Sequence, residues 1–290
     1  MEEVDLFGNK IEKDVILREL LLENPFTIRD AKSGNWQNRK KNWIKKGIRS
    51  EIGTDAKTYA LKDWDENKLN GKKIPIDISI FDPALCELMY KWFCPTGGSI
   101  IDPFAGGSVR GIVGNYLGYK YTGIDIRQEQ IDSNREQALE ILSVNNQPQW
   151  YVGDSNVILD ELKKNNNKYD MCLSCPPYGD LEIYSDLDGD ISNMPYEDFL
   201  VAYGSIISKT CSMLKEGAFA IFVVGEFRDK KGNYVGFVPD TIKAFMDCGM
   251  NYYNEAILAT PFVSAPIRAK GNMATKKLVK VHQNILMFKK

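Results

Sequence analysis

Histidine is nearly absent from this sequence of 290 residues, which contains only His282 beside six cysteines. Cys172 and Cys175 have the spacing of a CxxC zinc or redox pair, but the sequence holds no second pair to complete a zinc site. The pair also runs directly into Pro176 and Pro177 at the end of an expected strand, whereas a redox pair stands at the start of a helix. We therefore expect neither a metal site nor a redox function.

Long apolar segments are missing as well. The sequence has no apolar leader at its N-terminus and no run of about 18 apolar residues, the length that a membrane helix needs. Cysteines without an export signal favour a reducing compartment. We expect a cytoplasmic protein without disulfides and without a membrane partner.

An excess of charge of either sign is also lacking, because the net charge is −2, so a nucleic-acid surface must come from local clusters. Residues 32–50 hold seven basic residues, no acidic one, and Trp36 and Trp43. This mixture is typical either of nucleic-acid contact or of a solvated helix face whose tryptophans pack on the core. A second cluster is formed by Arg268, Lys270, Lys276, Lys277 and Lys280.

Two regions of different character divide the chain, whose 43% hydrophobic content suffices for one α/β core and a modest appendage. Residues 1–75 are predicted to be a small N-terminal extension, with an amphipathic helix over residues 1–24 followed by the basic and aromatic segment. Residues 76–290 are predicted to be one catalytic domain. In it, strands and helices alternate, which predicts a doubly wound, mostly parallel sheet of the α/β class.

The expected elements of that domain follow from apolar runs and helical spacing. Strands are predicted at 99–102, 121–125, 150–152, 169–173 and 218–224. Helices are predicted around 83–93, through 116, and around 128–142, 157–163 and 195–214. Residues 254–259 and 281–288 are predicted to form an antiparallel C-terminal pair that closes the sheet edge.

Three acids follow three successive expected strands. Asp102 opens the turn Asp102-Pro103-Phe104-Ala105-Gly106-Gly107-Ser108, whose glycines let the backbone pass close to a ligand. Asp125 ends the next strand, where such folds place an acid that accepts hydrogen bonds from ribose hydroxyls, and Asp154 follows the third strand. A single acid of this kind is more often a helix cap or turn former. Three in register indicate a ligand crevice.

The segment Asp102–Ser108 resembles the motif D-P-F-x-G-[SG]-G, with which amino-group DNA methyltransferases bind S-adenosyl-L-methionine (AdoMet). Ser79-Ile80-Phe81-Asp82 resembles the segment that closes over the methionine end of the cofactor, and the resemblance covers roughly residues 76–225 and the last ten. It implies a Rossmann-like, class I methyltransferase fold, with Asp125 on the ribose and Asp154 on the adenine amino group. The residues implied to bind the cofactor are Phe81, Asp82, Asp102, Phe104, Gly106, Gly107, Asp125, Ile126, Asp154 and Ser155.

Ser174-Cys175-Pro176-Pro177-Tyr178 ends the fourth expected strand, where the same family carries [D/N/S]-P-P-[Y/F/W]. An aromatic amino nitrogen is a poor nucleophile until acceptors hold its hydrogens. The family supplies these acceptors from the first side chain and the first proline carbonyl, while the aromatic ring stacks on a base flipped out of the duplex. The resemblance therefore implies four catalytic residues, Cys175, Pro176, Pro177 and Tyr178.

Cys175 departs from the family pattern, because thiol sulfur is a weak hydrogen-bond acceptor. The carbonyl of Pro176 could suffice with help from Ser174, or Cys175 could act as a partly ionised acceptor. Alternatively, Cys175 could attack a pyrimidine ring and promote methylation at carbon 5. An RNA amino methyltransferase and a non-catalytic module that binds AdoMet or DNA are further alternatives. The motif context favours methyl transfer to N6 of adenine or N4 of cytosine in DNA.

The expected partner is double-stranded DNA, from which the target base would be flipped. Because the chain leaves no room for a large recognition domain, the resemblance implies a stand-alone or phage-type modification methylase in a bacterial or phage-infected cell. It would act as a monomer or a homodimer. Residues 179–198 hold seven acids and no lysine or arginine, which predicts a lid over the site or a partner for the basic N-terminal region.

Overall fold

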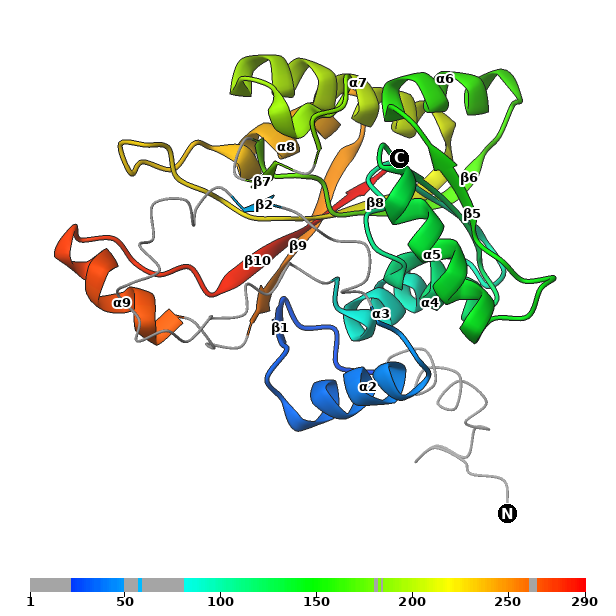
Figure 1. Ribbon diagram of the computed structural model, residues 1–290, viewed down its shortest axis with the longest axis horizontal. Helices are drawn as coiled ribbons and strands as arrows, with labels where there is room; N and C mark the ends of the chain where they lie inside the picture. The colour runs from blue at the N-terminus through cyan, green and yellow to red at the C-terminus, as the bar shows by residue number, and fades with distance from the viewer. Residues whose placement is uncertain (1–21, 50–56, 59–80, 180–181, 184, 261–264) are drawn as a thin grey trace, which may run out of the picture.

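A single eight-stranded sheet forms the centre of the computed structural model, which describes residues 22–49, 57–58, 81–179, 182–183, 185–260 and 265–290 (Figure 1). Its strand order is β1-β9-β10-β8-β6-β3-β4-β5, and β2 and β7 form a separate pair. The strands are β1 (Ile28–Asp30), β2 (Lys57–Thr58), β3 (Ser99–Asp102), β4 (Lys120–Asp125), β5 (Gln149–Val152), β6 (Tyr169–Ser174), β7 (Glu182–Ile183), β8 (Leu214–Val224), β9 (Asn251–Ala259) and β10 (His282–Lys289).

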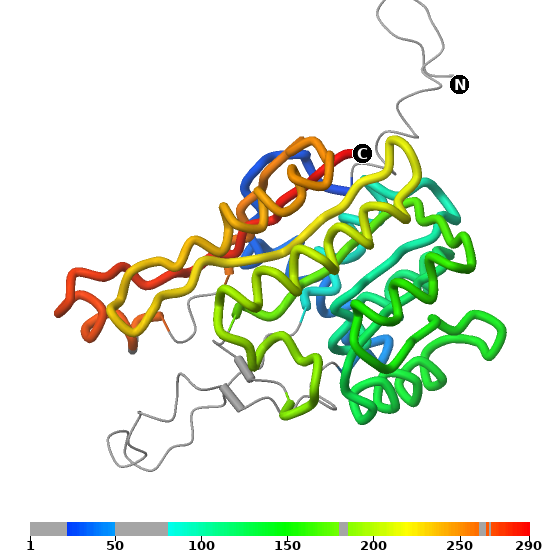
Figure 2. The backbone as a smooth tube through the Cα atoms, turned by 90° about the horizontal axis from the view of Figure 1, so that it is seen from above, coloured from blue at the N-terminus to red at the C-terminus, as the bar shows by residue number. Residues whose placement is uncertain are grey.

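Helices cover both faces of the sheet (Figures 1 and 2). They are α2 (Gly34–Lys45), α3 (Pro83–Phe93), α4 (Val109–Tyr116), α5 (Gln128–Ile141), α6 (Ser155–Lys164), α7 (Tyr196–Met213), α8 (Phe237–Asp247) and α9 (Ala265–Ala274). Two cores result: α2 to α5 contribute to one, and α6, α7 and α8 to the other. Among the described residues, no helix is long and apolar enough to cross a membrane.

The central strands are buried on both faces, which explains their nearly continuous apolar sequences. In β6, Met171 and Leu173 face the first core, whereas Cys172 between them faces the second. β6 pairs in parallel with β3 and β8, and β4 pairs in parallel with β3 and β5. This arrangement confirms the predicted doubly wound, mostly parallel sheet, whose strand carboxyl ends meet at one edge.

The C-terminal strands are antiparallel as predicted, but they do not close the sheet edge. β10 inserts between β8 and β9, and β1 pairs in parallel with β9, from Ile28 opposite Ile257 to Asp30 opposite Ala259. The edge strand is therefore contributed by the N-terminal region. Sequence analysis also missed α8, α9 and the short strand β1.

Helix α2 supports one of the two interpretations of the N-terminal basic segment, in which the tryptophans pack on the core. Trp36 and Trp43 are buried, and their indole N–H groups donate to Asp82 Oδ2 at 3.1 Å and Glu87 Oε2 at 2.8 Å. The tryptophans therefore pack on the core beside α3. The helix predicted over residues 1–24 lies mostly outside the described residues, and residues 22–24 are not helical. The domain boundary predicted near residue 76 also lies outside them.

A candidate cofactor and catalytic cavity

A cavity of about 300 Å³ lies at the carboxyl ends of β3, β4, β5 and β6. It brings together the turn after β3, the acid after β4, the acid after β5 and the loop after β6. Of the residues predicted from sequence, those that line it are Phe81, Asp82, Phe104, Gly106, Gly107, Asp125, Ile126, Asp154, Ser155, Cys175, Pro176, Pro177 and Tyr178.

Asp102 is the one predicted cofactor residue that does not line the cavity. Its side chain is fully buried. One carboxylate oxygen accepts from Ser174 Oγ at 2.5 Å, and the other accepts from Arg110 Nε at 2.5 Å and Tyr121 Oη at 2.7 Å. A buried carboxylate needs such partners. Asp102 therefore positions Arg110, whose guanidinium does line the cavity.

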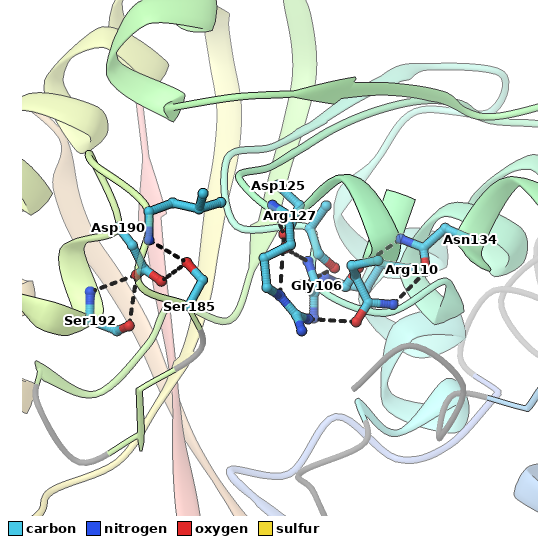
Figure 3. A network of polar contacts seen from close by, with 11 residues as sticks. Gly106, Arg110, Asp125, Arg127, Asn134, Ser185, Asp190 and Ser192 are labelled. Atoms are coloured by element: carbon cyan, nitrogen blue, oxygen red, sulfur yellow. Dashed lines mark hydrogen bonds and ion pairs between the residues drawn. The ribbon is translucent and has the colours of Figure 1, made fainter. Parts of the chain in front are cut away.

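The turn after β3 and the acid after β4 are joined by hydrogen bonds (Figure 3). Gly106, with a φ of +49°, donates its N–H to Asp125 Oδ2 at 3.0 Å, and the Arg127 N–H donates to Oδ1 at 2.9 Å. Burial raises the pKa of Asp125, and these N–H groups partly oppose the increase. Because each carboxylate oxygen has two lone pairs, Asp125 can still accept hydroxyl hydrogens from a ligand in the cavity.

Asp154 combines a structural role with its place in the cavity. Its Oδ1 accepts from the Asn156 N–H at 2.8 Å and so caps α6, while Ser155 Oγ donates to the carbonyl of Pro103 at 2.6 Å. Asp154 is therefore both a helix cap and a cavity residue. Its other oxygen, Oδ2, faces Gly189, where an added Cβ would lie 3.1 Å away.

A loop from the acidic segment borders this end of the cavity through Gly189, Asp190 and Ile191. Asp190 is held rigidly, because it accepts hydrogen bonds from Ser185 Oγ at 2.6 Å and from the N–H and Oγ of Ser192 at 2.9 and 2.7 Å (Figure 3). Asp190 was not predicted as a site residue. The charge of Asp190 contributes to raising the pKa of Asp125. That the segment acts as a lid remains a prediction.

The opposite end of the cavity carries two cations that sequence analysis did not assign to it. Arg110 stacks on Phe81, with Cζ 4.5 Å from the ring centroid, and Lys40 Nζ lies 3.5 Å from Asp82 Oδ2. Both cations line the cavity. Lys40 belongs to the basic segment of residues 32–50, but the sequence does not distinguish it from the other basic residues there. The packing of α2 on α3 places it at the cavity.

The loop after β6 contributes the four predicted catalytic residues to the wall of the cavity. Cys175 is half-buried and lies near Arg110. The Tyr178 hydroxyl accepts from Gln283 Nε2 at 2.9 Å, and its ring packs against Phe237 with centroids 5.6 Å apart. Gln283, a cavity residue from β10, was missed because no local motif marks it.

Ser174, expected to help the Pro176 carbonyl, lies away from the cavity. Its side chain is fully buried, its hydroxyl donates to Asp102, and it does not line the cavity. Of this motif, Cys175, Pro176, Pro177 and Tyr178 line the cavity, so an acceptor from the loop would come from among them. Among the described residues, no group of three or more His, Cys, Asp or Glu side chains is placed to hold a metal ion.

Comparison with known proteins finds similarity in structure only. No family model matches the sequence, and no curated protein matches it significantly. SMU.776, a proposed methyltransferase complexed with SAH, superposes with a TM-score of 0.52 and 13% identity, over 73% of this chain and 50% of its own. A proposed SAM-dependent methyltransferase from Streptococcus mutans gives 0.50, with the same identity and coverage. TrmN from Thermus thermophilus gives 0.47 with 12% identity, over 72% and 48%.

The matched part thus spans about half the length of these solved proteins. The two solved structures with TM-scores of 0.52 and 0.50 match 73% of this chain. The chain therefore has the Rossmann-like fold of class I AdoMet-dependent methyltransferases, with an antiparallel C-terminal strand, as the sequence predicted.

Proposed function

We propose that this protein transfers a methyl group from AdoMet to an exocyclic amino group of a DNA base, either N6 of adenine or N4 of cytosine. The observation that carries this proposal is the single cavity in which Gly106 and Asp125 lie beside Cys175, Pro176 and Tyr178. Methyl transfer needs donor and acceptor within reach of each other, and one shared cavity meets that requirement.

The cavity fits AdoMet in size and in the order of its polar groups. Its volume of about 300 Å³ is within the range of small-molecule sites. Asp125 would accept the ribose hydroxyls and Asp154 the adenine amino group, while Lys40 and Arg110 offer positive charge to the carboxylate at the methionine end. SMU.776, which has the same fold, was solved in complex with SAH.

When bound, AdoMet supplies a methyl group activated by its sulfonium. The Pro176 carbonyl and Cys175 would accept the hydrogens of the target amino group, directing its lone pair toward the methyl carbon. Tyr178 would stack on the flipped base, with its hydroxyl held by Gln283. The bond from nitrogen to the methyl carbon would form as the carbon–sulfur bond breaks and leaves a neutral thioether, and the nitrogen would then release one proton to solvent.

Direct transfer is favoured over attack by a Cys175 thiolate on a pyrimidine ring. Two prolines and an aromatic residue follow Cys175 and present a carbonyl acceptor and a stacking ring, the two groups that amino methylation needs. Substitution of Cys175 by alanine separates the mechanisms. Near-normal turnover supports transfer through the Pro176 carbonyl, whereas complete loss, together with a covalent DNA adduct in the wild type, identifies a nucleophile.

The proposal is tested by incubating the protein with methyl-labelled AdoMet and either duplex DNA or structured RNA, followed by digestion to nucleosides. Label in N6-methyladenine or N4-methylcytosine from DNA is the expected result. Label in 5-methylcytosine would overturn the mechanism, and label only in RNA would overturn the substrate. No label in either polymer would leave a module that binds without catalysis.

A further inference from the structure

Two segments form a projection at one end of the sheet, which we call the basic arm: residues 226–236, between β8 and α8, and residues 265–281, which contain α9 (Figures 1 and 2). The first is a hairpin, closed by a bridge between Arg228 and Tyr234. The two segments touch, because Lys280 Nζ donates to the Glu226 carbonyl at 3.3 Å and Lys277 Nζ packs over Gly232.

The basic arm is strongly cationic, with eight basic residues and two acidic ones. Both acids are engaged by backbone N–H groups. Glu226 accepts from Gly236 and Val238 at 3.1 and 2.8 Å, and Asp229 accepts from Asn233 at 2.8 Å. Their carboxylates therefore organise the hairpin and the start of α8.

Among the described residues, none of the arm's lysines or arginines forms an ion pair. Five of these side chains are exposed: Lys230, Lys231, Arg268, Lys270 and Lys276. Because the whole chain has a net charge of −2, the rest of the molecule must be distinctly negative. Gathering like charges costs free energy through mutual repulsion, and a polyanion bound there would relieve it.

The base of the arm adjoins the catalytic loop. Thr260 precedes the second segment and Gln283 follows it, and both line the cavity. Gln283 hydrogen-bonds to Tyr178, and a Cβ added at Gly225 would lie 2.7 Å from Lys280 Nζ and 3.6 Å from the Tyr178 ring. A polyanion held by the arm would therefore run past the mouth of the cavity at Tyr178.

We infer that the basic arm binds the phosphate backbone of double-stranded DNA and holds the duplex beside Tyr178. This inference rests on the proposed function, because methyl transfer is what requires a base to be delivered to Tyr178. A duplex is favoured over a single strand, because single-strand sites combine positive charge with several stacking aromatics. The arm has one exposed aromatic residue, Tyr234, and Arg228 already covers its ring at 4.0 Å.

The test compares two triple variants of equal charge change in the full chain. The arm variant is Arg268→Gln, Lys270→Gln, Lys276→Gln; the control is Lys120→Gln, Lys163→Gln, Lys164→Gln, whose residues are exposed on β4 and α6. Binding of a fluorescein-labelled DNA duplex is followed by anisotropy from about 50 to 200 mM salt. We expect the arm variant to bind about 100-fold more weakly at low salt, with a salt slope smaller by about 2 to 3.

The control variant should bind as the wild type does, and both variants should retain the wild-type affinity for AdoMet, which shows that they are folded. Equal DNA affinity of the arm variant and the wild type would overturn the inference. Wild-type binding to duplex RNA but not to duplex DNA would also overturn it. Duplex DNA that binds through the arm but receives no methyl group would contradict the proposed function while leaving the inference intact.

Discussion

Two basic regions of this protein look alike in sequence but differ in what their charges contact. In the N-terminal region, Arg39 pairs with Glu87 at 3.1 Å, Lys40 pairs with Asp82 at 3.5 Å, and Arg49 pairs with Glu140. In the basic arm, which contains the C-terminal cluster, no such pairs occur among the described residues. Three of the seven basic residues in positions 32–50 are therefore paired with acids of the molecule, whereas the cations of the arm are available to a ligand.

The difference follows from where each segment packs. Helix α2 lies on α3, whose Glu87 and N-cap Asp82 supply carboxylates. The two tryptophans of α2 are buried at the same contact. The arm extends beyond the sheet, away from α2 and α3 (Figure 2). A local density of lysine and arginine thus indicates a nucleic-acid surface only where no acids of the same chain neutralise it.

The largest contrast between the regions should be in stability. Trp43 is 4% exposed, packs on Tyr116 and donates to Glu87. We expect Trp43→Ala to lower the free energy of unfolding by about 3–5 kcal/mol, since it leaves a cavity and an unpartnered acceptor. Tyr234→Ala on the arm should change it by about 0.5 kcal/mol or less. Urea denaturation measures both, and similar values for the two variants would remove the contrast.

The next contrast concerns DNA affinity. Lys41 and Lys45 are exposed cations of α2, as are the substituted cations of the arm. We expect Lys41→Gln, Lys45→Gln to change duplex affinity by about threefold or less, against about 100-fold for the arm variant. Anisotropy titrations at one low salt concentration measure the duplex affinities of both variants. A loss of equal size from α2 would show that both basic regions bind DNA.

Lys40 should behave unlike its neighbours, because it faces the cavity. If it binds the cofactor carboxylate, Lys40→Met should weaken AdoMet binding about tenfold, the size of one charge-assisted hydrogen bond. The affinity for 5′-methylthioadenosine, which lacks the amino-acid portion, should stay the same. Isothermal titration calorimetry gives both values, with Lys41→Met as the matched control. An equal loss for both ligands would indicate a general collapse of the cavity wall instead.

The smallest effect should be a pH dependence of DNA binding. Burial lowers the pKa of Lys280 to about 8, although the charge of Glu226 opposes the shift. As pH rises through about 8, this ammonium loses its proton and its attraction for phosphate, while ordinary lysines with pKa values of about 10.4 stay charged. Burial and, to a smaller extent, the charge on Lys280 lower the pKa of His282, so His282 gains no charge in this range.

Duplex affinity should therefore fall severalfold from about pH 7 to about pH 9, and the salt slope should decrease by about one. Lys280→Gln should bind more weakly at the lower pH and show no such change. Persistence of the pH dependence in this variant would assign it to another group.

Sequence analysis predicted the features that local motifs encode. The strand ends at Asp102, Asp125 and Val152 and the loop at Cys175 were located correctly, because apolar runs followed by glycine, proline or acid mark parallel strands. Their convergence in one cavity follows from the doubly wound topology. The burial of Asp102 was not predictable, since it depends on Arg110 and Tyr121 folding back onto it.

The features that were not predicted from the sequence depend on long-range packing. Strand β1 has three residues and pairs with a strand more than 200 positions away, so no local period identifies it. Lys40 and Gln283 reach the cavity from regions without a recognisable motif, through the packing of α2 on α3 and the insertion of β10 beside β8. The internal neutralisation of the N-terminal cations became visible only with these contacts.

The most direct test of the division between catalytic cavity and basic arm is steady-state methylation at varied duplex concentration, comparing the wild type with the arm variant Arg268→Gln, Lys270→Gln, Lys276→Gln. We predict that the KM for DNA rises by about the factor lost in binding, while kcat at saturating duplex stays within about twofold of the wild type. A fall in kcat with an unchanged KM would contradict the account, because the arm would then shape the catalytic cavity instead of holding the duplex.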